Sequence, residues 1–198
     1  MLRKSTNSGR RSAVITGVLL IFGLVTGIFS VVPVIDGVDY LVKASTNENE
    51  LLTGAFFQLL MVVAYVGVPI IMYPILSKHN KGLALGSVAF GIIAGVFIII
   101  GVIILLLLLT LSHEFAKVGT LDVSSFQTLG VLLREGRDLV NHVALSILAS
   151  LLFMIRFIGL DATYMMLNFP IAFHQLVLAI WLIIKGFNLN TLLDKITN

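Results

Sequence analysis

The sequence contains no cysteine and few charged residues. Only 12% of its 198 residues are charged, whereas 58% are hydrophobic; a soluble chain carries about 25% charged residues. The absence of cysteine excludes disulfides, thiolate metal sites and cysteine nucleophiles. The 13 lysines and arginines form no stripe interleaved with aromatic residues, so nucleic acid is excluded as a partner. Such a composition suits a chain whose solvent is the lipid bilayer.

The longest stretch without a formal charge covers residues 82–113, between Lys81 and Glu114. Its centre is an isoleucine-rich run that leads into the five leucines Leu105–Leu109. A helix rises about 1.5 Å per residue, so about 20 apolar residues cross the roughly 30 Å of hydrocarbon. The stretch therefore predicts a transmembrane helix over 83–112 with residues to spare, and we expect its isoleucine and leucine half to face lipid.

The apolar segments together predict an all-α fold, in which residues 1–198 form a single integral membrane domain, a polytopic transmembrane helical bundle of about five spans. The first span has the charge layout of a secretory signal peptide, but it is longer than the usual ~7–15 apolar residues, so we predict that it is retained. The predicted spans are 13–35, 51–76, 83–112, 139–160 and 164–184.

The stretch from His113 to Asp138 is predicted to be the longest loop. Within it, Phe126, Leu129 and Leu133 recur at helical spacing, which is typical of a short helix lying in the membrane interface.

The distribution of lysine and arginine predicts the orientation of the chain. Four cations lie in the first eleven residues and two in the loop 77–82, whereas Lys43 is the only cation between the first two spans. The positive-inside rule places the N-terminus and the second loop in the cytoplasm. Five spans then place the C-terminus outside, against the preference of Lys185 and Lys195.

Small residues at four-residue spacing mark predicted contacts between helices, because close packing replaces the hydrophobic effect inside a bilayer. The alternative is that glycine is simply common in membrane helices. Whether such contacts join helices of one chain or of two copies stays open. The predicted packing residues are Gly23, Gly27, Ser87, Gly91, Gly95, Ser146 and Ser150.

A series of motifs in order along nearly the whole chain resembles those of one bacterial family of small multi-pass membrane proteins. The motifs are Asp39–Leu41, Asn47–Asn49, Tyr73–Pro74, Lys78–Gly86, Phe126–Gly130, Leu167–Ala172 and Val177–Phe187. The family is the domain of unknown function DUF4386. The resemblance implies a protein that usually has six spans and no assigned activity.

The chain departs from this family pattern in two ways. About one crossing and a loop, roughly 30 residues, are missing after about Phe153; in a six-span relative the C-terminus would be cytoplasmic, as its cations prefer. Members also often carry arginine and glutamate where this chain has Gly91 and Ala94, and glutamate where it has Gln175. If those charges serve the family's function, this chain lacks it.

Polar and ionisable side chains inside spans are costly, so each is a candidate site. The candidates are His142, Arg156, Asn168, His174 and Gln175. Two further polar residues, Gln58 and Tyr65, lie two turns apart and are expected on one side of the second span.

One hypothesis pairs His142 and His174 as axial ligands of a haem. Their expected depths differ by about six residues, roughly 9 Å. The alternative is that His174 hydrogen-bonds a neighbouring helix as a neutral imidazole. Arg156 is expected to extend to the interface, and Asn168, followed by Pro170, to shape a helix start.

Catalytic motifs such as H-E-x-x-H and G-x-S-x-G are absent, as are paired acids within the spans. We therefore predict that the chain is not an enzyme and has no cofactor or metal. We predict a non-enzymatic bundle that acts by packing or partner interaction, with the bilayer and another membrane protein or a second copy as partners. The alternative is a small transporter or a binder of a lipid or small apolar ligand.

Overall fold

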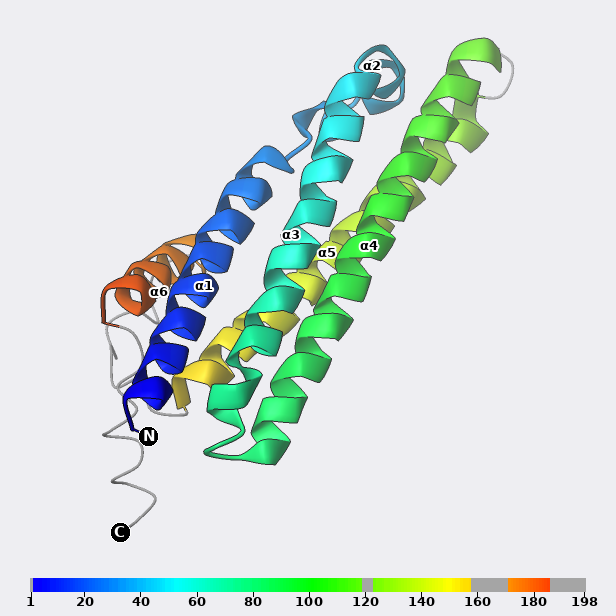
Figure 1. Cartoon of the computed structure of the whole chain (residues 1–198). Coiled ribbons are helices and arrows are strands. Elements are labelled where there is room, and N and C mark those ends of the chain that lie inside the picture. Colours follow the sequence, from blue (N-terminus) through cyan, green and yellow to red (C-terminus); the bar gives the residue numbers. More distant parts are fainter. Residues whose placement is uncertain (1, 119–122, 158–170, 186–198) are drawn as a thin grey trace. The chain divides into compact units, whose positions relative to one another are not determined.

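The computed structural model describes residues 2–118, 123–157 and 171–185, with side chains for residues 9–117, 123–151 and 176–184. All regular structure in these ranges is helical, which confirms the predicted all-α class (Figure 1). The elements are α1 (Leu2–Phe29), the 3-10 helix η1 (Pro33–Ile35), α2 (Tyr40–Thr46), α3 (Glu48–Leu76), α4 (Lys81–Val118), α5 (Val123–Phe157) and α6 (Ile171–Lys185).

Three helices of the described chain are long and apolar enough to cross a membrane, namely Gly9–Phe29, Glu48–Leu76 and Lys81–Lys117. They contain most of the first three predicted spans. The first is shorter than predicted because α1 ends at Phe29, just before Pro33, whose ring favours the start of η1 instead. The fourth and fifth predicted spans fall on α5 and α6, and residues 158–170 between those helices lie outside the described residues.

The predicted loop from His113 to Asp138 is mostly helical. Helix α4 continues to Val118 and α5 already begins at Val123. The polar residues of this stretch indicated a loop, but Phe115 and Phe126 pack against each other with ring centroids 5.8 Å apart. Both rings are partly buried against the core of the second unit, in the parts of α4 and α5 that lie beyond the apolar segments.

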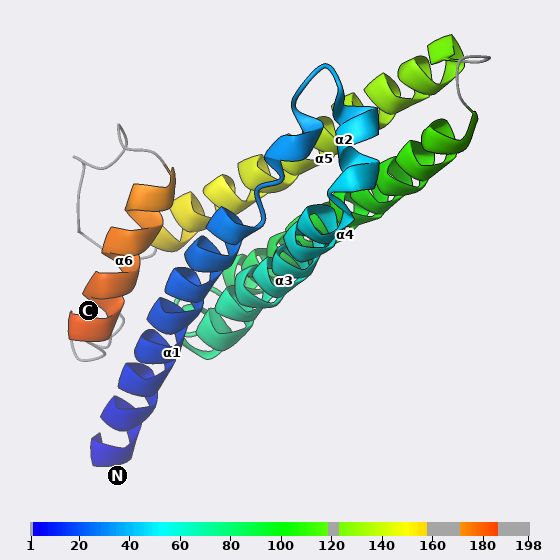
Figure 2. The ribbon, with the colours of Figure 1, turned by 90° about the horizontal axis from the view of Figure 1, so that it is seen from above.

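The described chain divides into two compact units. The first unit comprises residues 1–24, 64–92 and 148–198, and α6 lies along α1 in it (Figure 2). Close approach of these helices depends on Gly17, where a Cβ would lie 2.7 Å from Ile183 Cγ1 and 2.8 Å from Ala179 O. Leu20, Met72 and Leu182 are fully buried in the core of this unit.

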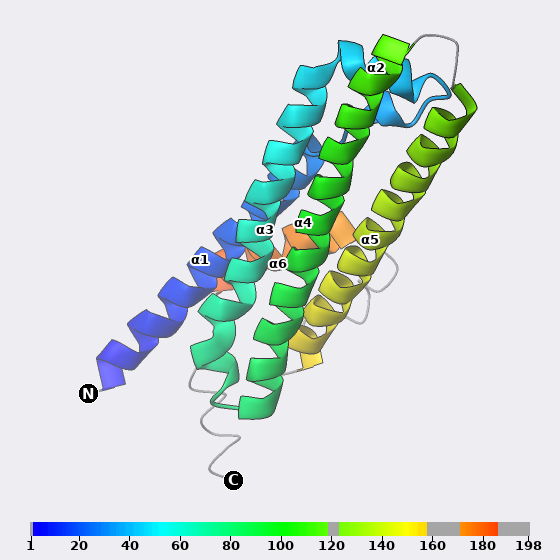
Figure 3. The same ribbon diagram turned by 90° about the vertical axis from the view of Figure 1, so that its right-hand side faces the viewer.

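The second unit comprises residues 25–63 and 93–147, and its α3 and α4 segments lie side by side with α2 at one end (Figure 3). The leucine run of α4 was expected to face lipid, but only part of it is exposed. Leu105 and Leu108 are fully buried and Leu109 nearly so, whereas Leu106 and Leu107 are exposed. The core of this unit also contains Val32, Ile35, Tyr40, Leu41, Ala44, Leu51, Ala55 and Val102, with Phe126 and Leu133 packed against it.

Two sequence features explain how α3 and α4 form and pack. Asn80 caps α4, because its Oδ1 accepts a hydrogen bond from Leu83 N at 3.1 Å. Pro69 lies inside α3 and faces α4 at Gly91, where a Cβ would lie only 2.6 Å from Pro69 Cγ. The proline that removes a backbone donor from α3 is thus accommodated by a glycine on the next helix.

Candidate functional site

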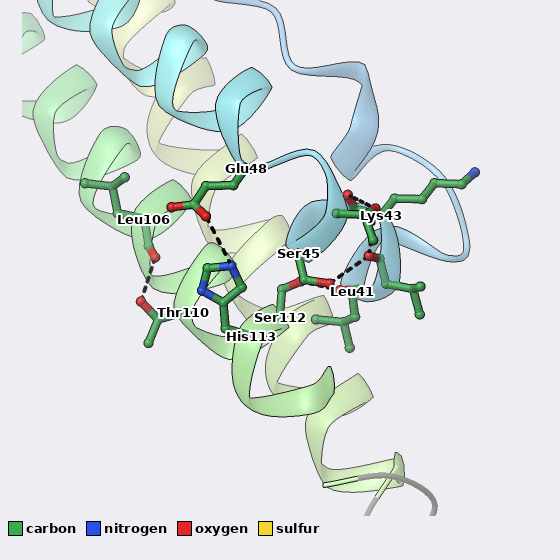
Figure 4. A network of polar contacts seen from close by, with 10 residues as sticks. Leu41, Lys43, Ser45, Glu48, Leu106, Thr110, Ser112 and His113 are labelled. Atoms are coloured by element: carbon green, nitrogen blue, oxygen red, sulfur yellow. Dashed lines mark hydrogen bonds and ion pairs between the residues drawn. The ribbon is translucent and has the colours of Figure 1, made fainter. Parts of the chain in front are cut away.

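The most highly connected polar residues of the second unit surround the short helix α2. Ser112 of α4 is fully buried and its Oγ donates a hydrogen bond to Leu41 O (Figure 4). On the neighbouring connection, the backbone N–H of Val34 donates to Glu50 Oε1 at 3.4 Å. These contacts attach the segment between α1 and α3 to the long helices.

Tyr40 of α2 attaches the same segment to α5. Its hydroxyl donates to Gln127 O at 3.3 Å, and its ring occupies the space beside Gly130, where a Cβ would collide with the tyrosine hydroxyl. The Arg134 guanidinium carbon lies 5.2 Å from the centroid of the Tyr40 ring, within range of a cation–π interaction. Burial raises the pKa of Tyr40, and the nearby charge of Arg134 partly offsets this rise.

Arg137 is the most unusual side chain of this region because it is charged and only 8% exposed. Burial lowers its pKa, while Asp138 and Asp36 oppose that shift. Its Nη1 lies 4.0 Å from Asp138 Oδ1, and its buried Nε has no hydrogen-bond partner. Arginine stays protonated in proteins, so a cation is held between α5 and the connection after α1 with one donor unused.

A further polar contact joins the start of α3 to the end of α4. Glu48 Oε2 lies 3.7 Å from His113 Nε2, and both side chains are partly exposed (Figure 4). An exposed pair of this kind contributes little to stability. We therefore regard it as an accessory to the Tyr40 and Ser112 contacts.

Of the five predicted polar site residues, only His142 has a described side chain. It is exposed, and its Nδ1 lies 2.7 Å from Asp138 O one turn earlier on α5. Arg156 lies on α5, and His174 and Gln175 lie on α6, but their side chains are outside the described set, as is the whole of Asn168. The haem pair of His142 with His174 and a joint polar site of these residues therefore stay predictions.

Of the four glycines among the predicted packing residues, Gly23 and Gly91 lie at close helix contacts. A Cβ at Gly23 of α1 would lie 3.2 Å from Ala64 Cβ on α3, and one at Gly27 would lie 3.4 Å from Met61 Sδ. Gly91 faces Pro69 as described above, and Gly95 is buried.

The predicted packing serines differ from one another. Ser87 is fully buried and donates to Leu83 O at 2.8 Å on its own helix. Ser146 donates to His142 O at 2.8 Å, but it lies on an exposed face of α5, as does Ser150. The α5 serines thus mark a surface of the chain.

Among the side chains that the structure describes, two buried ones have an oxygen without a hydrogen-bond partner. They are Thr16, through Oγ1 in the first unit, and Gln58, through Oε1 in the second. Gln58 and Tyr65 are both buried, as expected for residues two turns apart on α3. No group of three or more histidines and acids that could hold a metal ion occurs among the described residues.

Our sequence reasoning did not select Tyr40, Arg134 or Arg137. A signal was present, because Phe126, Leu133 and Arg137 share one face of α5 with Gly130, and that face packs inward. The positive charge of Arg137 concealed this pattern, since an arginine beside an aspartate normally indicates a solvated loop.

The helical fold, with three described helices suited to crossing a bilayer, defines an all-helical membrane protein. Within this class, residues 15–165 match the profile of the domain of unknown function DUF4386, and the chain belongs to that family. Comparison with curated proteins and with solved structures finds no match in either set.

Proposed function

We propose that this chain is a non-enzymatic, multi-pass protein of the bacterial cytoplasmic membrane that acts by binding a partner protein. In this proposal five segments cross the membrane and the N-terminus is cytoplasmic. The cations of the first eleven residues and of the loop 77–82 support this orientation. Eight of the ten acidic residues lie in the stretches 36–50 and 114–138, which the proposal places on the outer side.

The depth of the second unit in the membrane follows from α5. Between Asp138 and Arg156 this helix carries no charge, and 17 residues make about 26 Å of helix, close to one hydrocarbon thickness. The outer edge of the hydrocarbon would then lie near Asp138.

The contacts between α5 and α4 show which residues of α4 lie at the same depth as Asp138. Phe126 contacts Phe115, and Asn141 Oδ1 would lie 2.5 Å from a Cβ at Gly101. Both contacts fit one antiparallel register, in which Asp138 lies opposite Ile103 and Ile104. The leucines that follow on α4 would therefore stand outside the hydrocarbon.

The single observation that carries the proposed function is that this outer part has a core of its own. Leu41, Leu105 and Leu108 are buried together there, and the Tyr40 and Ser112 hydrogen bonds close the same region. We refer to α2 with residues 48–55, 104–118 and 123–138 as the outer cap. A packed cap of helix ends presents a fixed surface to water, which suits protein contact better than transport through the bundle.

Purification of the full-length chain from its native membrane tests this function. We expect a second protein to co-purify at a fixed molar ratio. The ratio should fall for Tyr40→Ala, which removes the contact of α2 with α5, and should be unchanged for Tyr73→Ala, which alters an exposed tyrosine on α3. Recovery of the chain with only a bound lipid or pigment would contradict the proposal and favour a ligand binder.

A further inference from the structure

Helix α5 has a second row of apolar residues, and the three leucines in it are exposed. Leu129, Leu132, Gly136, Leu139 and Val143 recur at spacings of three and four residues, the seam pattern of paired helices. Leu132 and Leu139 are 67% and 66% exposed, and Leu129 is 51% exposed. We call these five residues the outer α5 face.

This face is separate from the one that packs inward. Phe126 and Leu133 pack against the core of the second unit, and Arg137 is buried. The sequence-based expectation grouped Leu129 with Phe126 and Leu133, but the structure turns Leu129 outward. A helix whose packing needs are met on one side therefore retains a second row of leucines.

Among the described residues, none packs closely enough against Gly136, in the middle of this face, to require a glycine there. Glycine inside a helix costs about 1 kcal/mol relative to alanine. At the other glycines described above, a neighbouring helix or side chain fills the space, but a Cβ at Gly136 would meet nothing within 4 Å. An open glycine between two exposed leucines fits a close approach by a helix from outside the chain.

One exposed acid borders the outer α5 face. Glu135 lies about one turn from both Leu132 and Leu139, and its side chain is 66% exposed. The Nη2 atom of Arg134 lies 3.7 Å from Glu135 Oε1, but Arg134 lies over the Tyr40 ring and its side chain is only 26% exposed. Asp138 lies on another side of α5, beside the buried Arg137. The surface offered to a partner is thus apolar along its centre and acidic along one margin, at Glu135.

We propose that the outer α5 face binds a helix of a different protein, one with an apolar ridge and a lysine or arginine opposite Glu135. This inference rests on the proposed function, because it specifies the partner that the outer cap binds. The complementary charge opposite Glu135 would fix the register of the partner helix. A second copy of this chain fits less well, because it brings no exposed base beside the same face to pair with Glu135.

Photo-crosslinking in native membranes tests this inference. A photoreactive amino acid at Leu132 should yield an adduct with another protein, and the linked peptide should be an apolar helix with lysine or arginine within about one turn. The same group at Leu107, which is 50% exposed on α4, should give little of that adduct.

Charge reversal then separates specific docking from contact by chance. Glu135→Lys should reduce the Leu132 adduct about tenfold or more. Asp39→Lys, a matched reversal of an exposed acid outside the outer cap, should leave it unchanged. Gly136→Leu should abolish the adduct while the chain keeps its helical content, because the glycine has open space around it.

Three results would overturn the inference. An adduct at Leu132 that consists of a second copy would do so, as would a partner linked through Leu107 alone; in both cases the proposed protein-binding function stands. An adduct with lipid only, together with no co-purifying protein, would remove both the inference and the proposed function.

Discussion

The unusual residue of this protein is Arg137, a cation with a buried and unpaired Nε close to the proposed edge of the membrane. Two acids balance its charge, Asp138 on its own helix and Asp36 on the connection after α1. Because burial of a charge is unfavourable unless it is compensated, Arg137 links the position of that connection to the position of α5.

Replacing Arg137 with alanine should lower the free energy of unfolding by about 1–3 kcal/mol, because Asp36 and Asp138 lose their counter-charge and the buried stem leaves a void. Arg137→Met keeps most of the stem and should cost less. Reversible denaturation in detergent micelles, followed by circular dichroism, measures both variants. Equal stability of R137A and the unaltered protein would show that Arg137 does not hold the connection after α1 against α5.

Tyr40 should make stability depend on pH in the alkaline range. Burial raises its pKa in the folded protein, so an unfolded tyrosine, with a pKa of about 10, releases its proton first. Unfolding therefore releases protons above that pH, and the stability that is fully present below about pH 10 is lost as pH rises further.

Tyr40→Phe should weaken this alkaline loss and, by removing the hydrogen bond to Gln127 O, should lower stability at neutral pH by about 0.5–1.5 kcal/mol. Unfolding measured across the alkaline range tests both effects. Tyr73→Phe, a change at an exposed tyrosine, serves as the control. An unchanged alkaline loss in Y40F would assign the pH dependence to another group.

At the scale of helices, the sequence predicted the class and the locations of the long apolar elements, because apolar length alone identifies a membrane helix. It failed at 113–138, where the polar residues Glu114, Lys117 and Arg134 indicated a loop. In the folded chain Phe115 of α4 packs against Phe126 of α5. A contact between two helices cannot be recognised from the local sequence of either one.

The candidate site was predictable only in part for the same reason. Gly23 and Gly91, which the spacing selected, have a neighbouring helix close to the position of a Cβ, but the spacing could not identify that neighbour, such as Pro69 for Gly91. The cluster of Tyr40, Arg134 and Arg137 joins segments about 90 residues apart, and its arrangement depends on the register of the helices.

Two glycine substitutions should have opposite effects on the stability of the isolated chain. Gly91→Ala should destabilise it by about 1–3 kcal/mol, because the new methyl group would overlap the Pro69 ring. Gly136→Ala should stabilise it by about 0.5–1 kcal/mol, because alanine is the better helix former and nothing opposes its methyl group. Denaturation of the two purified variants under identical conditions compares them. Equal effects at both positions would mean that these glycines have the same surroundings.

At the scale of the whole molecule, the absence of cysteine permits a direct test of topology, because single cysteines can be introduced without background. Cysteines at Ser5 and Ser77 should react only from the cytoplasmic side, and those at Ser125 and Thr197 only from the outer side. Labelling of Thr197 from the cytoplasmic side would contradict five crossings. Labelling of Ser125 from that side would contradict the placement of the outer cap.

We propose that the leucine run of α4 belongs to the outer cap and does not lie in the hydrocarbon. The most direct test introduces one cysteine at Leu107 or at Val96, which lie on the same helix and are 50% and 49% exposed. The two positions differ in depth by about 16 Å of helix. If the leucine run lies outside the hydrocarbon, a membrane-impermeant thiol reagent added outside intact cells should label Leu107→Cys and leave Val96→Cys unlabelled. Protection of both cysteines would place the leucine run inside the bilayer and contradict this placement.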